Sequence, residues 1–187
     1  MDSSMTTSTS PLVTVTPERF SLVAYDADRI VSIVRELAER VGVTNPIVVD
    51  VDERTPLSKM SAAVDGSSSD ATVRLRFESG ALENTKALTT FGESRARLSI
   101  GRMLLRAADR LSGRFQDAPQ DTELTNPQNA AWDAYCGGRL ERLGLGPVEQ
   151  QYRYDFRNRF GFGDDTDAAF DRLWAADGLS WSDLPGT

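Results

Sequence analysis

Apolar residues recur every three to four positions in several stretches of the chain, the spacing that places them on one face of a helix. The first stretch begins after Asp26 or Asp28, either of which can cap a helix, and ends at Gly42. Gly137 and Gly138 interrupt the stretch over about 126–143. Each glycine costs about 1 kcal/mol of helix stability relative to alanine, so we expect close packing or a break there. The pattern predicts three further helices, over about 93–115, 126–143 and 165–177.

The segment 148–160 fits two structures. Its rings at Tyr152 and Phe156 lie four residues apart, as on one face of a helix, whereas Tyr152 and Tyr154 lie two apart, as on a strand. Pro147 favours the helix, because proline suits the first helical position.

Apolar and polar residues alternate over 71–78, which predicts a half-buried strand. An apolar run at 47–51 and a weaker one at 60–64 predict two more strands. The order of one helix, then strands, then helices is typical of an α+β fold. We therefore expect a small antiparallel sheet of about three strands covered by four to five helices.

Residues 1–16 are rich in serine and threonine and lack the basic and apolar segments of a signal peptide, so we expect a disordered tail. We expect residues 17–187 to form a single α+β domain, because this length is typical of one domain. No apolar run approaches the ~18–20 residues that span a bilayer, so no membrane partner is expected.

The chain contains no histidine and a single cysteine, Cys136. These counts exclude Ser-His-Asp and Cys-His nucleophile systems and histidine-ligated zinc. A metal site would need oxygen ligands, and no metal or cofactor is expected. One cysteine cannot form an internal disulfide and suits a reducing compartment, so we expect a cytoplasmic protein.

Four arginines of the helix over 93–115 fall on one narrow strip, which we call the arginine stripe: Arg95, Arg102, Arg106 and Arg110. Because four like charges repel, an anionic group should lie opposite them. It can belong to an acidic or phosphate-bearing partner, since the guanidinium makes paired hydrogen bonds to such groups. It can equally belong to the chain itself, which has 28 acidic and 21 basic side chains. The candidate acids are Asp164, Asp165, Asp167 and Asp171.

A second basic feature mixes rings and arginines over 152–160 and includes Tyr152, Arg153 and Arg157. Such mixtures bind single-stranded nucleic acid, with rings stacking on bases and arginines on phosphates. Rings four residues apart are also typical of a buried helical stripe with a solvated basic side. A net charge of −7 disfavours nucleic acid as the partner of the whole molecule.

Asp50 and Asp52 stand two residues apart at the end of a predicted strand, and two such carboxylates can hold Mg²⁺. The segment 48–55 (Val-Val-Asp-Val-Asp-Glu-Arg-Thr) resembles the first motif of the haloacid dehalogenase superfamily, although that family usually has glycine where this chain has Glu53. The resemblance implies a parallel sheet, Asp50 as a nucleophile toward phosphate and Asp52 as an acid and base. It also implies a lysine and later acidic ligands, for which Lys86, Asp164 and Asp165 are candidates.

A strand, a loop and a long helix in succession also occur in zinc-peptidase folds. The helix here begins Glu93-Ser94-Arg95-Ala96-Arg97 and has no ligand histidine, so this likeness concerns topology alone. The sequence as a whole favours a non-catalytic interaction module whose arginine stripe or aromatic-basic segment contacts a protein partner. A Mg²⁺-dependent phosphate-processing enzyme using Asp50 and Asp52, and a nucleic-acid-binding protein, are the alternatives.

Overall fold

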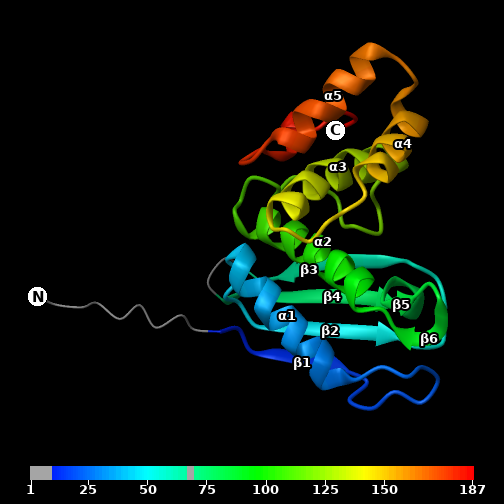
Figure 1. Ribbon diagram of the computed structural model, residues 1–187. Coiled ribbons are helices and arrows are strands. Elements are labelled where there is room, and N and C mark those ends of the chain that lie inside the picture. Colours follow the sequence, from blue (N-terminus) through cyan, green and yellow to red (C-terminus); the bar gives the residue numbers. More distant parts are fainter. Residues whose placement is uncertain (1–9, 67–69) are drawn as a thin grey trace, which may run out of the picture.

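A computed structural model describes residues 10–66 and 70–187 and confirms the α+β class (Figure 1). The segments 1–9 and 67–69, which include most of the expected tail, lie outside the described residues. In chain order the elements are β1 (Val13–Thr16), α1 (Ala27–Val41), β2 (Ile47–Asp52), β3 (Met60–Asp65), β4 (Thr72–Glu78), β5 (Glu83–Asn84), β6 (Ala87–Phe91), α2 (Glu93–Leu111), α3 (Asn126–Arg142), α4 (Glu149–Phe160) and α5 (Asp164–Ala175).

The main sheet is mixed, which corrects the expected antiparallel sheet of three strands. Its order is β1-β2-β4-β3; β1 and β4 each run parallel to β2, and β3 runs antiparallel to β4. The reason is the crossover through α1, which carries the chain back to the end of the sheet where β1 began and so makes β1 and β2 parallel. A short antiparallel pair, β5 and β6, was not expected and follows the sheet.

The strand β1 comes from residues assigned to the tail by sequence. Val13 and Val15 are buried, while Thr14 and Thr16 are exposed. Four residues with two valines are too few to predict a strand by themselves, and pairing with β2 supplies the hydrogen bonds that order them.

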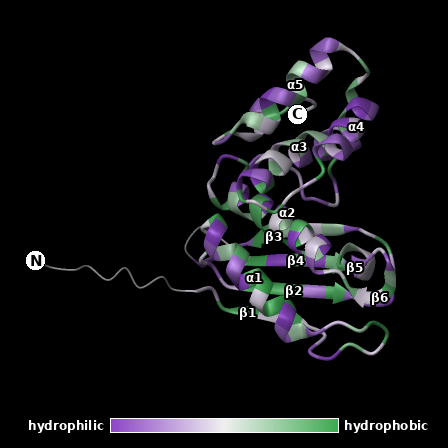
Figure 2. Cartoon of the chain, in the orientation of Figure 1, coloured by the Kyte–Doolittle hydropathy of each residue, from purple (hydrophilic) through white to green (hydrophobic). Residues whose placement is uncertain are grey.

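One face of the sheet carries the apolar core. Burial alternates along β4, with Val73, Leu75 and Phe77 fully buried and Arg74 and Arg76 exposed. Figure 2 colours the elements by hydropathy and shows hydrophobic and hydrophilic positions mixed along the strands. The buried face packs against α1 and α2 in one continuous cluster. The half-buried strand expected over 71–78 is therefore confirmed.

The helix boundaries follow the sequence signals closely. Asp26 caps α1 by accepting from the backbone amide of Asp28, and Gly42 ends it with a φ of 83°. The segment 148–160, whose pattern fitted a helix or a strand, forms helix α4. Phe156 at the centre of this helix is buried against other helices rather than in a sheet.

A second core lies among α3, α4 and α5, and α2 contacts both cores (Figure 1). The glycines of α3 are sites of close packing, one of the two expected outcomes. A Cβ on Gly138 would lie 1.8 Å from the carbonyl oxygen of Trp174, so only glycine lets α5 approach this closely. Within the described residues, no helix combines the length and apolar character needed to cross a membrane.

Candidate functional site

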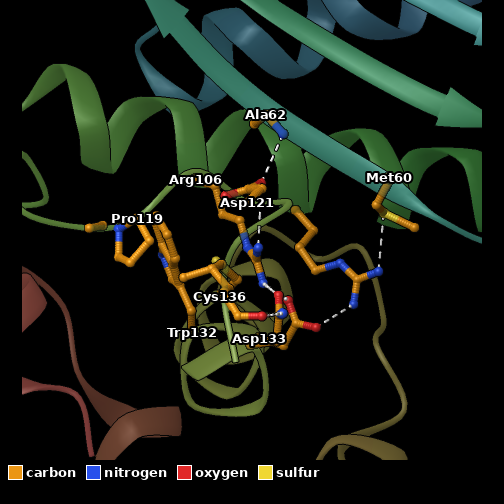
Figure 3. A network of polar contacts seen from close by, with 12 residues as sticks. Met60, Ala62, Arg106, Pro119, Asp121, Trp132, Asp133 and Cys136 are labelled. Atoms are coloured by element: carbon orange, nitrogen blue, oxygen red, sulfur yellow. Dashed lines mark hydrogen bonds and ion pairs between the residues drawn. The ribbon is translucent and has the colours of Figure 1, made fainter. Parts of the chain in front are cut away.

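The arginine stripe lies along α2 and is mostly inside the molecule. Figure 3 shows Arg106 between β3 on one side and α3 on the other, with Asp121 and Asp133 beside it. Asp133 belongs to α3, and Asp121 belongs to the connection between α2 and α3. The stripe therefore faces the helical part of the chain rather than open solvent.

Arg106 is the most enclosed member of the stripe, with a side chain that is 3% exposed. It forms ion pairs with Asp133 at 2.8 Å and with Asp121 at 3.4 Å, and its guanidinium lies 4.9 Å from the centre of the Trp132 ring. Burial alone would lower the pKa of Arg106, but the charges of Asp133 and Asp121 outweigh burial and raise it. Arg106 thus stays charged and neutralised within the fold.

Arg110 and Arg102 have acidic partners as well. Arg110 pairs with Asp121 at 2.8 Å, and Arg102 pairs with Asp133 at 3.0 Å. Asp121 also accepts from the backbone amide of Ala62 in β3 at 2.8 Å, which ties the connection to the sheet. Three of the four stripe arginines are thus paired by the chain's own acids, through Asp121 and Asp133 rather than the acids of α5 named from sequence.

Arg95 differs from the other three. It lies in the first turn of α2, and its guanidinium donates to the Ser58 hydroxyl at 2.7 Å. Within residues 10–66 and 70–187, no acidic side chain lies within ion-pair distance of it. Arg95 is therefore the stripe arginine that has no ion pair among the described residues.

A hollow of about 360 Å³, which we call the α2 hollow, opens beside Arg95. Among the described residues the Nη2 atom of Arg102 donates only to the sulfur of Met60, a weak acceptor, so this nitrogen can donate a stronger hydrogen bond. Burial raises the pKa of Tyr152 to about 12, so its hydroxyl remains a donor at neutral pH. The lining residues are Ser58, Met60, Arg95, Leu98, Ser99, Arg102, Ala130, Asp133, Gln151, Tyr152 and Asp155.

A larger hollow of about 670 Å³ adjoins the first and shares Ser58, Met60, Arg102 and Asp133 with it. It runs past the end of β4, where the Oε2 atom of Glu78 is buried without a hydrogen-bond partner. The two hollows form one groove between β3 and the helical part, with Arg95 at one end and Lys59 beside the other.

The aromatic-basic segment forms α4, and its side chains turn toward α5. Tyr152 packs edge-on against Trp174 with ring centres 5.5 Å apart. Arg153 pairs with Asp171 at 2.5 Å, and Arg157 makes two hydrogen bonds to Asp167 at 2.7 and 2.6 Å. These contacts hold α4 to α5, and Tyr152 and Asp155 are the members of this segment that line the α2 hollow.

Asp50 and Asp52, the two carboxylates at the end of β2, contact different partners. Asp52 accepts from the Thr55 hydroxyl and from the Arg54 amide, and these bonds lower its pKa. Asp50 lies 3.9 Å from Arg76 on the exposed face of the sheet. Figure 1 places α5, which begins with Asp164 and Asp165, on the side of α3 away from the sheet, and Lys86 follows β5. The described residues contain no group of three or more acidic or cysteine side chains able to hold a metal.

The expected succession of a strand and a long helix is present as β6 and α2. In a two-histidine zinc helix, ligands stand four residues apart on one face. The stripe residues Arg102 and Arg106 have that spacing here and point toward Asp133. A guanidinium has no lone pair to offer a metal, and this pair repels a cation instead.

Comparison of the chain with known protein families, with curated proteins and with solved structures finds no significant match. The contacts within the molecule therefore carry the functional argument.

Proposed function

We propose that this protein is a non-catalytic interaction module that binds an acidic or phosphate-bearing group of a protein partner in the α2 hollow. The observation that carries the proposal is Arg95, the one stripe arginine without an acidic partner among the described residues. It stands at the rim of a hollow large enough for a side chain of a partner.

The donors around the hollow suit an anion. Arg95, Arg102 and Tyr152 line it from α2 and α4, beside two carboxylates. Asp133 is occupied by its ion pairs with Arg102 and Arg106, and Asp155 lies on α4. A carboxylate or phosphate entering beside Arg95 would accept charge-assisted hydrogen bonds, which are about twice as strong as neutral ones. The Ser58 hydroxyl already holds Arg95, so the guanidinium is ordered before the partner arrives.

The chemistry of the groove supports binding rather than catalysis. Arg102 and Arg106 occupy the centre of the groove and form ion pairs, and neither can act as a base near neutral pH. Burial raises the pKa of the Cys136 thiol to about 12, so this cysteine is not a nucleophile at neutral pH. A free thiol of this kind suits the reducing cytoplasm, where we place the protein.

The test is to compare partner capture by the tagged wild-type chain with capture by Arg95→Gln, using quantitative mass spectrometry. Arg35→Gln is the matched control, because Arg35 is an exposed arginine on α1 with no ion pair among the described residues. We expect a stoichiometric protein partner whose affinity falls about tenfold or more in Arg95→Gln and not in the control, a loss of about 1.4 kcal/mol. The affinity should also fall with added salt.

Equal capture by both variants would contradict the proposal. The alternatives give different results in the same purified material. A Mg²⁺ enzyme predicts a rise in melting temperature in millimolar Mg²⁺ that Asp50→Asn abolishes. A nucleic-acid-binding protein predicts salt-dependent binding of a single-stranded oligonucleotide.

A further inference from the structure

A third hollow, of about 310 Å³, lies where α1, α2 and α3 end, and we call it the arginine pocket. Four arginines line it: Arg40 near the end of α1, Arg114 after α2, and Arg139 and Arg142 near the end of α3. None of them belongs to the arginine stripe or to the aromatic-basic segment. The pocket is therefore independent of the site in the preceding section.

The pocket holds more positive than negative charge. Its two acids are Asp109 and Asp177. Asp109 is already occupied, because Arg139 donates to both of its oxygens at 2.7 Å and the Trp132 ring nitrogen donates at 2.8 Å. The other three arginines share the pocket with one remaining acid, Asp177.

The three remaining guanidiniums are held in place mainly by carbonyl oxygens, which orient a charge without cancelling it. Arg142 donates to the carbonyls of Trp174 at 2.8 Å and Ala176 at 2.6 Å, and Arg40 donates to the carbonyl of Leu143. Arg40 also lies 3.8 Å from Glu36, an exposed pair that contributes little.

Arg114 has the weakest attachment, a bond of 3.4 Å to the carbonyl of Gly178. Among the described residues neither Arg114 nor Arg142 forms an ion pair. The ends of α1, α2 and α3 add about half a negative charge each, which reduces the positive excess of the pocket but does not cancel it.

We propose that the arginine pocket binds a phosphate group. The guanidiniums of Arg40, Arg114 and Arg142 line one pocket, and a guanidinium can donate paired hydrogen bonds to a phosphate. The group can be free phosphate or a small phosphate ester, or it can be the phosphorylated side chain of a peptide. The volume of the pocket accommodates either source.

The experiment is isothermal titration of the full chain with inorganic phosphate, with phosphoserine and with a phosphoserine peptide beside its unphosphorylated counterpart. We expect binding of at least one phosphate-bearing probe, weakened about tenfold or more by Arg114→Gln. Arg114 suits this test because it is exposed and its loss removes only a weak bond. Arg172→Gln, an exposed arginine on α5, is the control and should bind like wild type.

The different probes distinguish the two sources of the phosphate group, and the variants distinguish the two pockets that could bind it. Binding of all phosphate probes alike assigns the pocket to a free phosphate, whereas binding of the phosphopeptide alone assigns it to a modified protein. Binding that Arg95→Gln abolishes and Arg114→Gln leaves unchanged would overturn the arginine pocket and move the phosphate to the α2 hollow. Absence of binding by every probe at millimolar concentration would also overturn it.

Discussion

The buried carboxylate of Asp121 connects helix α2 to strand β3. It is 2% exposed, pairs with Arg106 and Arg110, and accepts from the Ala62 amide of the edge strand β3. Removing it would leave two guanidiniums enclosed without their shared partner, and that situation is far more costly than losing a surface ion pair.

We predict that Asp121→Ala lowers the free energy of unfolding by about 3–5 kcal/mol, measured by urea denaturation. Asp65→Ala is the control, because Asp65 pairs with Arg74 on the surface, where both side chains are more than half exposed. The control should change stability by less than about 1 kcal/mol. Similar losses in the two variants would show that burial does not set the strength of these pairs.

Cys136 allows a second prediction at the residue scale. Burial is the main cause that raises the pKa of its thiol, from 9.0 to about 12, so the thiol is protonated and enclosed at pH 8. We expect no reaction with a disulfide reagent in the native protein and full reaction in urea. Rapid labelling of the native protein would contradict the burial.

The same thiol has a consequence for stability at high pH. The unfolded thiol ionises near pH 9, whereas the folded one resists ionisation until about pH 12. Between these values ionisation stabilises the unfolded state alone. The contribution of Cys136 to the free energy of unfolding is therefore fully present below pH 9 and is lost as the pH rises from 9 to 12.

At the scale of elements, the contact of α3 with α5 depends on two glycines in a helix interior. Helix propensity alone would make Gly138→Ala stabilising by about 1 kcal/mol. The structure reverses this sign, because the new methyl group would meet the backbone of Trp174, which cannot rotate away as a side chain can.

We predict that Gly138→Ala destabilises the protein by about 2 kcal/mol, a typical cost of forcing extra volume into a packed interface. Gly163→Ala is the control, since no atom beyond its two neighbours in the chain lies within 4 Å of its added methyl group among the described residues. The control should change the free energy of unfolding by less than about 1 kcal/mol. A stabilised Gly138→Ala protein would show that α5 can move away from α3 at little cost.

At the scale of the whole molecule, two apolar cores are joined by α2 and by the ion pairs around Asp121 and Asp133. All three tryptophans, Trp132, Trp174 and Trp181, lie in the helical core. Tryptophan fluorescence therefore reports on that core, whereas far-ultraviolet circular dichroism reports on both.

We predict that the two signals follow one unfolding transition in urea, because neither core can separate without exposing the buried ion pairs. In Asp121→Ala the coupling is weaker, and we expect the two midpoints to move apart. Different midpoints in the wild-type protein would show that the two cores unfold independently.

Local periodicity determined the α+β class, the positions of the helices and the buried face of β4. These features depend on neighbours a few residues apart, so they can be predicted from sequence alone. The parallel pairing of β1 with β2 could not, because four residues with two valines become a strand only when another strand provides hydrogen bonds.

At the candidate site, too, the sequence determined some properties of the arginine stripe and the tertiary structure decided others. The sequence alone determined that Arg95, Arg102, Arg106 and Arg110 share one side of a helix, and that an anion is needed there. Only the tertiary structure decided that Asp121 and Asp133 neutralise three of them, while Arg95 has no acidic partner in the part of the chain that the structure describes. An ion pair depends on distance in space, and the packing of α3 against α2 sets that distance rather than the spacing of charges along the chain.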